Sequence, residues 1–263
     1  METAISQARN VGVGIVTMFN SGHMGAVGHF SMMAAQQDMV GMCSVAAGTG
    51  ILPTFGAEPR LGTNPISIAS PSNLEAPILF DAATSAVAGN KLRLAARVDA
   101  TLLPGWVASS DGSPIMEETK IVNRDDYYQL PLGGSREQGS HKGYGFGLMS
   151  EILATGLSGA ISAMVIGSGK TSRTGGTSCH YFCAYNIEAF TDVELFKDNM
   201  DNMLQALKDT PPAPGQDRVI YPGLSEYEEE EDRKANGIPL HSEVVEWFTD
   251  ITSELSVPMV KIL

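Results

Sequence analysis

The spacing of apolar side chains predicts alternating helices and strands along the whole chain. In residues 25–39, Ala26, Phe30 and Met33 follow the i, i+4, i+7 spacing of a helix with one buried stripe. The predicted helices span 3–10, 25–39, 91–96, 146–157, 188–208 and 242–255, the last capped by Ser242. The predicted strands span 11–18, 40–46, 66–69, 78–81 and 181–185.

Two segments rich in glycine and proline interrupt this pattern. Residues 102–114 predict a long surface excursion, and residues 132–145 predict a loop that leads into the helix at 146. Glycines and Lys142 ahead of a helix N-terminus suggest an anion cradle, because free N–H groups and the helix dipole favour negative charge. Between the strands, Asn64 precedes a proline in a rigid turn that we expect to present polar groups.

Size and charge narrow the class of protein. The chain has 263 residues, of which 43% are hydrophobic, enough for one large or two modest cores. A net charge of −13 argues against nucleic-acid binding, which requires cationic surfaces. The acidic run 226–232 is interpreted as a solvated face or a helix start. An alternative interpretation of the protein, as an acidic protein-interaction module, rests on this run alone.

The cysteines indicate a reducing compartment. Cys43, Cys179 and Cys183 form no regular disulfide framework. A metal site at Cys179, His180 and Cys183 is rejected, because on a strand the histidine points away from the two cysteines, and no other metal site is predicted. Without a signal peptide or an apolar run of about 18 residues, we expect no membrane contact and a cytoplasmic protein.

One histidine stands out as a candidate for proton transfer. His23 follows an apolar run and lies beside Gly22, which lets a turn bring the imidazole close to a ligand. Imidazole takes and gives protons near neutral pH. A histidine in a turn also has purely structural uses, so spacing alone leaves both interpretations open.

Two nucleotide-binding motifs are excluded by their spacing. Residues 167–171 resemble a P-loop, but Met164 stands where the first glycine is required. The pairs Gly12/Gly14 and Gly143/Gly145 lack the third glycine of the dinucleotide fingerprint. A nicotinamide cofactor would therefore need an architecture other than the Rossmann fold.

Six motifs in order resemble the type-2 malate/L-lactate dehydrogenase family over essentially the whole chain. They are Ser21-Gly22-His23, Gly62-Thr63-Asn64-Pro65, residues 80–85, residues 130–134, residues 141–145 and Tyr221-Pro222-Gly223. The family contains malate, lactate, sulfolactate and ureidoglycolate dehydrogenases and imino-acid and diketogulonate reductases. The resemblance implies an α/β fold with a non-Rossmann mixed sheet flanked by helices, one unit over residues 1–263 of two interleaved lobes, NAD or NADP, and a homodimer.

The same resemblance implies roles for individual residues. His23 matches a proton acceptor, and Lys142 a cofactor contact. The other implied cofactor contacts are Asp81, Ala82, Ala83, Gly223, Leu224, Ser225 and Glu226, with Ala47 where relatives have a serine. For the substrate carboxylate, the candidates are Arg60 by bidentate pairing, the neighbouring Thr63, and Arg173.

The implied activity is hydride transfer between NAD or NADP and a small 2-hydroxy or 2-oxo acid. Family members also carry an N-terminal helical region with a Ser-His-Gly motif and a carboxylate-binding arginine, and this chain begins after that region. Three explanations are open: the chain is a fragment, it takes those groups from elsewhere, or it has lost full activity. The alternative function is a truncated or non-catalytic homologue that keeps cofactor binding or dimerisation only.

Overall fold

A five-stranded sheet forms the centre of the computed structural model, which describes residues 1–120, 127–166 and 178–259. The strand order is β1-β7-β2-β3-β4, and each neighbouring pair is antiparallel. The strands are β1 (Val13–Ser21), β2 (Met39–Ala46), β3 (Ile66–Ser70), β4 (Ile78–Ala82) and β7 (Ser178–Asn186). β7 lies between β1 and β2, and residues 178–184 are buried, as expected for an apolar central strand covered on both faces.

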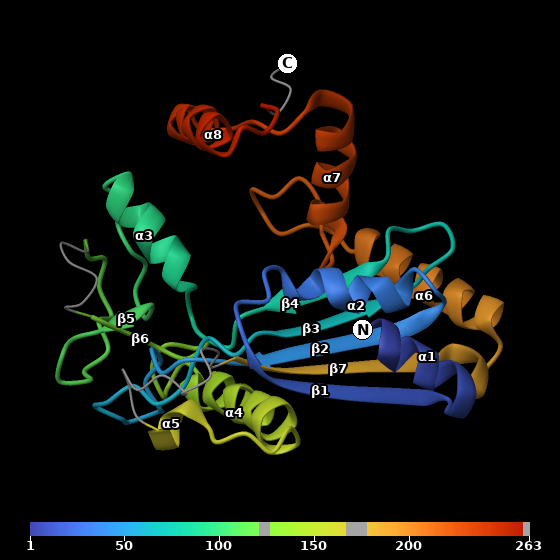
Figure 1. The fold of residues 1–263 in the computed structure, drawn as a ribbon, viewed down its shortest axis with the longest axis horizontal. Coiled ribbons are helices and arrows are strands. Elements are labelled where there is room, and N and C mark those ends of the chain that lie inside the picture. The colour runs from blue at the N-terminus through green and yellow to red at the C-terminus, as the bar shows by residue number, and fades with distance from the viewer. Residues whose placement is uncertain (121–126, 167–177, 260–263) are drawn as a thin grey trace.

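Two helices cover one face of this sheet (Figure 1). α1 (Glu2–Val11) and α2 (Val27–Ala35) pack their apolar stripes against Phe182 and its neighbours. Glycines in the strands permit the close approach: a Cβ on Gly14 would lie 1.9 Å from the carbonyl oxygen of Ala4, and one on Gly41 2.1 Å from that of Ser31.

The opposite face is covered by α4 (Ser140–Ser150), which continues as a π-helical segment over Glu151–Gly156. Ala154 packs there against Cys179, Tyr181 and Cys183. The cysteine face of β7 is therefore core, as predicted.

The predicted loop 132–145 is wrong in its second part, because α4 already begins at Ser140. Gly139, with φ +101°, ends the loop. The next glycine, Gly143, lies inside the helix, where a Cβ would meet the backbone nitrogen of Leu132 at 2.5 Å. Close helix packing, rather than a flexible turn, accounts for this glycine.

A smaller unit adjoins the sheet. It contains α3 (Gly89–Arg97), β5 (Val107–Ala108) and β6 (Tyr128–Gln129), around a core that includes Leu92, Leu102 and Val107. The prediction of a surface excursion over 102–114 is wrong for its first half, because Leu102 and Val107 are fully buried. Prolines and glycines set the turns here, while single apolar residues between them fill this second core.

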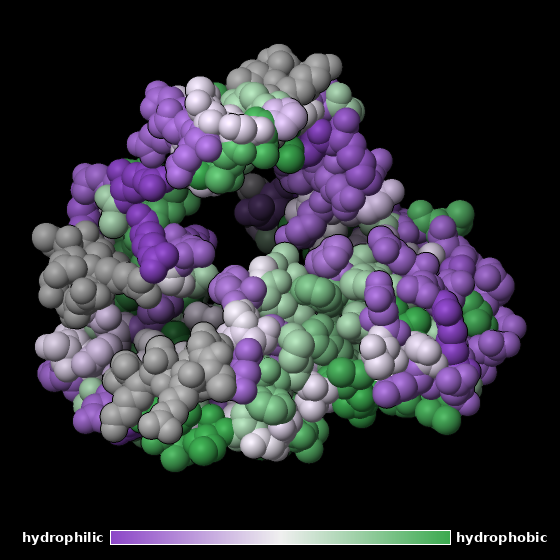
Figure 2. Space-filling view, in the orientation of Figure 1, coloured by the Kyte–Doolittle hydropathy of each residue, from purple (hydrophilic) through white to green (hydrophobic). Residues whose placement is uncertain are grey.

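The remaining helices are α5 (Ala163–Ile166), α6 (Val193–Lys208), α7 (Leu224–Asn236) and α8 (Ser242–Leu255), with a 3₁₀ turn over Ile187–Ala189. α6 begins later than predicted because Asp192 caps it by accepting a hydrogen bond from Leu195 N at 2.8 Å. The cap of α8 is His241 rather than Ser242. α7 carries the acidic run on an exposed surface, and its region is hydrophilic in Figure 2.

The predicted strands and the α/β class are confirmed, with boundaries that shift by a few residues. Among the described residues, no helix combines the length and the apolar character needed to cross a membrane.

Candidate active site

A cavity of about 510 Å³ brings predicted cofactor residues together from three separate segments. Its lining includes Asp81 from β4, and Gly223, Ser225 and Glu226 at the start of α7. The third side is the start of α2, which contributes Ala26, Gly28 and His29. Residues far apart in the sequence therefore meet where β4 and the two helix N-termini adjoin.

Asp81 is held by the N-terminus of α2. Its Oδ2 accepts a hydrogen bond from Gly28 N at 2.7 Å. A carboxylate is favoured at this position because the first N–H groups of a helix lack intrahelical partners. The contact fixes one carboxylate oxygen, and no hydrogen bond within the described residues uses the other.

Gly223 joins α7 to β4. Its φ is +96°, and a Cβ would lie 2.6 Å from the backbone nitrogen of Leu79. Leu79 N donates a hydrogen bond to Pro222 O at 3.1 Å, which adds the Tyr-Pro-Gly segment along the outer edge of β4. Only glycine fits here, so α7 begins directly against the strand.

Leu224 does not line the cavity. It is buried with Leu204 and Tyr221 in a separate apolar cluster. The Tyr221 hydroxyl donates to Ala76 O at 2.9 Å, which fixes this side of the segment. Leu224 thus anchors α7, while Ser225 and Glu226 reach the cavity.

His23 lies in the loop that joins β1 to α2. Met18 pairs with His180 and the next pair is Ser21 with Ser178, so β1 carries one extra residue. This β-bulge coincides with the positive φ of Asn20, 54°. Bulges redirect the chain and often re-aim side chains beside functional sites. Here the bulge turns the chain out of the sheet just before His23.

The protonation of the His23 ring follows from one contact. Gly25 N lies 3.0 Å from Nδ1 of His23. Because an amide N–H can only donate, Nδ1 is the acceptor, and the neutral ring carries its hydrogen on Nε2. In this conformation the exposed ring offers an N–H donor to a ligand, and its one basic nitrogen, Nδ1, becomes free only when the Gly25 contact opens.

The loop with Ala47, Thr63 and Asn64 has a scaffolding role in this structure. Asn64 is 1% exposed and accepts from Ala47 N at 3.2 Å. Its amide donates to Gly147 O at 3.0 Å and to Glu151 Oε1 at 3.2 Å. The expectation that Asn64 presents its polar groups outward is therefore wrong, because the end of β2 and the α4 helix use them.

Thr63 and the segment after β4 are tied together through the backbone. The carbonyl oxygen of Thr63 accepts from Thr84 N at 2.8 Å and from Thr84 Oγ1 at 3.0 Å. This holds Ala82 and Ala83, both half-buried, beside the 62–64 turn. Neither alanine is among the residues that line the cavity.

Arg60 and Lys142 do not line this cavity. Arg60 forms an exposed ion pair with Glu58. Lys142 is exposed in the first turn of α4, with its side chain running back past Gly139. Arg173 lies outside the described residues.

Sequence reasoning missed two histidines. His29 lines the cavity from the first turn of α2; the helix predicted over 25–39 contained it, but the apolar stripe did not single it out. His180 is 2% exposed on β7, and its two ring nitrogens have no hydrogen-bond partner among the described residues. The alternation of β7 had assigned it to the core, which is correct but incomplete.

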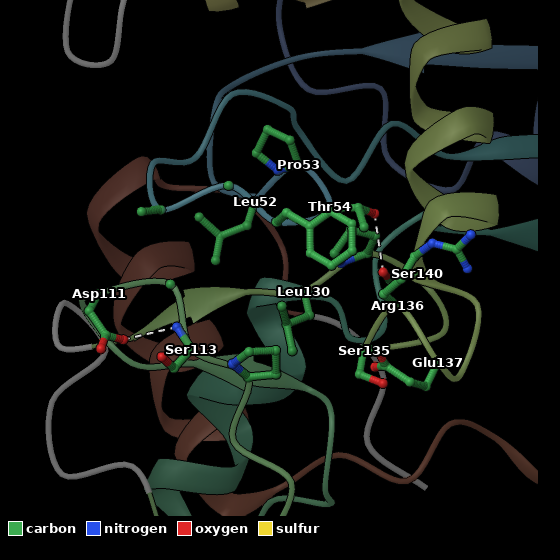
Figure 3. Close-up of a pocket in the computed structure, with 17 residues that line it drawn as sticks. Leu52, Pro53, Thr54, Asp111, Ser113, Leu130, Ser135, Arg136, Glu137 and Ser140 are labelled. Carbon is green, nitrogen blue, oxygen red and sulfur yellow. Dashed lines mark hydrogen bonds between the residues drawn. The ribbon is translucent and has the colours of Figure 1, made fainter.

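A second cavity, of about 350 Å³, lies between the loop after β2, the turn after β5 and the start of α4 (Figure 3). Asp111 is tied there to the backbone of Ser113 at 2.9 Å, and Ser140 to Thr54 at 3.1 Å. None of the predicted site residues lines it.

Comparison with known proteins identifies the family. The family model described as malate/L-lactate dehydrogenase matches residues 1–249. The chain belongs to the malate/L-lactate dehydrogenase family. This confirms the resemblance carried by the six motifs.

Individual members of the family support the same assignment. Malate dehydrogenase of Pyrococcus abyssi is 36% identical over 98% of this chain and 70% of its own length. Malate/(S)-sulfolactate dehydrogenase of Methanothermus fervidus is 35% identical over 98% of this chain and 72% of its own. The crystal structure of malate dehydrogenase from Entamoeba histolytica superposes with a TM-score of 0.88 at 32% identity, over 99% of this chain and 73% of that one.

Proposed function

We propose that this chain transfers a hydride between a nicotinamide dinucleotide and a small 2-hydroxy or 2-oxo acid. Family membership supports the class of reaction. The observation that supports this site is the cavity between β4, α2 and α7, in which Asp81, Gly223 and Glu226 meet. When bound, the cofactor supplies the hydride chemistry, and the protein supplies binding, orientation and proton management.

The cavity fits the ribose part of a dinucleotide. Asp81 has one carboxylate oxygen fixed by Gly28 and a second that can accept from a ribose hydroxyl. Gly223 leaves no Cβ in the space beside Leu79, which keeps the first turn of α7 against the strand. Ser225 and Glu226 then reach the same ligand from the opposite wall.

The charges of the lining favour NAD over NADP. Asp81 and Glu226 are carboxylates, and the described lining contains no lysine or arginine. A 2′-phosphate would face two anions without a cationic partner, whereas a ribose diol would donate to them. We expect a higher kcat/KM with NADH than with NADPH, and a smaller ratio in Asp81→Asn and Glu226→Gln.

His23 exchanges a proton with the substrate. Its Nε2–H donates a hydrogen bond to the 2-oxo oxygen during reduction, where negative charge develops. In oxidation, the Gly25 contact opens and the freed basic nitrogen of the neutral ring takes the hydroxyl proton; in reduction, the protonated ring returns this proton to the oxygen and becomes neutral again. Arg60 and Arg173 are the proposed partners of the substrate carboxylate, with Thr63 nearby. Lys142, Ala47, Ala82 and Ala83 complete the proposed cofactor surroundings, and Leu224 supports them by anchoring α7.

The test combines binding and turnover. NADH binding is followed by its fluorescence, and NADH oxidation is then assayed with oxaloacetate and pyruvate. His23→Ala should lower turnover by about 100-fold or more while NADH binding remains. His241→Ala, an exposed histidine on α8, is the matched control and should keep full turnover. Full turnover in His23→Ala would refute the role of His23, and binding without turnover in the wild type would favour the non-catalytic alternative.

A homodimer in a reducing compartment completes the proposal. β1 is an edge strand with exposed apolar side chains on both faces, including Ile15, Met18 and Phe19, and a second copy would cover this edge. Cys43, Cys179 and Cys183 are unpaired, which supports the cytoplasm. Sedimentation equilibrium should give twice the chain mass for the wild type and a smaller mass for Phe19→Asp.

A further inference from the structure

His180 is a buried imidazole that the proposed mechanism does not yet use. It is 2% exposed, and neither Nδ1 nor Nε2 has a hydrogen-bond partner among the described residues. A neutral imidazole has one donor and one acceptor, and burying both without partners costs free energy. Such a group is an unusual choice in a core where an apolar ring would fit, so its polar atoms call for an explanation.

The sheet places this imidazole beneath the loop that carries His23. Side chains alternate along β7, so His180 shares the face of Phe182, and their ring centroids are 6.2 Å apart. That face is the one covered by α1 and α2, and Met24 of the 22–26 loop packs on it. Figure 1 shows the loop leaving the sheet at the end where β7 begins.

Local register brings the two histidines close. His180 pairs with Met18, the last residue of β1 before the bulge, and on its other side with Val45 of β2. Burial lowers the pKa of His180, while the Gly22 backbone raises it in part through a hydrogen-bond interaction, although neither ring nitrogen reaches full hydrogen-bond geometry; the charge of His23 lowers it further. Both loop residues are thus near enough to act electrostatically on the buried ring.

The His23 ring itself shows why the loop needs a second anchor. Its Nδ1 is held by Gly25 N at 3.0 Å, a contact that must open before His23 can take a proton. Opening removes the one side-chain hydrogen bond that fixes the ring in the described structure. A buried donor below Gly22 can replace it without any contact to the substrate.

We propose that His180 is a positioning residue for His23: its ring N–H donates to the carbonyl oxygen of Gly22 when the 22–26 loop takes its proton-transferring conformation. In the described conformation, in which Gly25 holds the His23 ring, the Gly22 backbone is near His180 but the bond does not reach full hydrogen-bond geometry, and the loop movement completes it. The inference rests on the proposed function, because it gives His180 a part in the same proton transfer.

The test uses three variants of the full chain. His180→Phe keeps a ring and removes the donor, while His180→Asn and His180→Gln place an amide N–H near the positions of Nδ1 and Nε2. In His180→Phe we expect kcat for oxaloacetate reduction to fall about 5- to 10-fold, the effect of one neutral hydrogen bond of about 1 kcal/mol. KM, NADH affinity and melting temperature should not fall, and one of the two amide variants should restore kcat to within about 3-fold.

A second readout does not depend on turnover. The imidazole ¹⁵N resonances of His23 and the carbonyl ¹³C resonance of Gly22 are recorded with and without NADH, in the wild type and in His180→Phe. The NADH-induced change in Gly22 should be present in the wild type and absent in His180→Phe.

The outcomes separate the two proposals. Wild-type turnover decides the proposed function, while the ratio of His180→Phe to wild type decides the role of His180. Unchanged kcat in His180→Phe, identical Gly22 and His23 resonances in both proteins, or a joint loss of stability and kcat that neither amide restores would overturn the inference.

Discussion

Truncation of Asn64 tests how the loop after β2 is connected to α4. Asn64→Ala removes three hydrogen bonds, from Ala47 N and to Gly147 O and Glu151 Oε1. Because Asn64 is 1% exposed, water replaces none of them without a rearrangement. The two neutral bonds are worth about 1 kcal/mol each and the bond to the carboxylate about 1.5–3 kcal/mol, so the free energy of unfolding should fall by about 3.5–5 kcal/mol.

Urea denaturation followed by circular dichroism measures this change, with the m-value as a check that the transition stays two-state. Asn64→Asp sharpens the interpretation, because it keeps an acceptor for Ala47 N and sets a carboxylate against Glu151 at the same site. It should therefore be at least as destabilising as alanine at neutral pH. The matched control, Asn90→Ala, removes an exposed asparagine of α3 and should change stability by less than about 0.5 kcal/mol.

A loss below about 1 kcal/mol in Asn64→Ala, at an unchanged m-value, would refute this account. It would mean that the three partners find other hydrogen bonds and that the junction of β2 with α4 does not depend on this amide.

Three further predictions address other parts of the chain. Gly223→Ala should cost about 2 kcal/mol or more in urea denaturation and weaken NADH binding, because φ is +96° and the new Cβ would meet Leu79 N at 2.6 Å; wild-type stability and affinity would contradict it. Burial lowers the pKa of His180 below its ordinary 6.5. The unfolded state then binds the proton more tightly than the folded state does. The contribution of His180 to the free energy of unfolding is therefore complete above about pH 6.5 and is lost as the pH falls toward the lowered pKa of the folded state. His180→Phe should flatten this part of the pH profile, and equal profiles would exclude the contribution. His241→Ala removes the acceptor for Glu243 N at 3.3 Å, so hydrogen exchange should speed up by about 2- to 5-fold in the first turn of α8 alone; faster exchange in the sheet would argue against a local cap.

The sheet was predictable from sequence because its signals are local. The strand at 40–46 and the apolar 181–185 segment have the length and composition of buried strands. Their partners were not predictable, since nothing in either segment specifies that residues 178–186 insert between β1 and β2. One prediction from glycines was wrong: Gly143 was assigned to a loop, whereas it lies in a helix whose close packing requires it.

The candidate site was predictable only where a motif carried it. The family resemblance predicted four cofactor residues that line one cavity in the structure: Asp81, Gly223, Ser225 and Glu226. Asn64 was noticed as a polar residue before a proline. The direction of its amide, however, depends on α4, which is distant in the sequence. His180 and His29 carried no motif of their own, because their significance arises from the loop and the cavity that fold against them.

The strand order also constrains how the chain is made. β1 and β2 do not pair with each other; both pair with β7, whose first residue is Ser178, and β2 pairs with β3 on its other side. During synthesis both strands leave the ribosome with open edges, and more than half of the chain must follow before the strand that joins them exists. Such non-local pairing slows folding and leaves strand edges open to other chains. A chain that stops before Ser178 should therefore aggregate rather than form a smaller version of this fold, and it also lacks the acidic surface of α7, which follows β7 in the sequence.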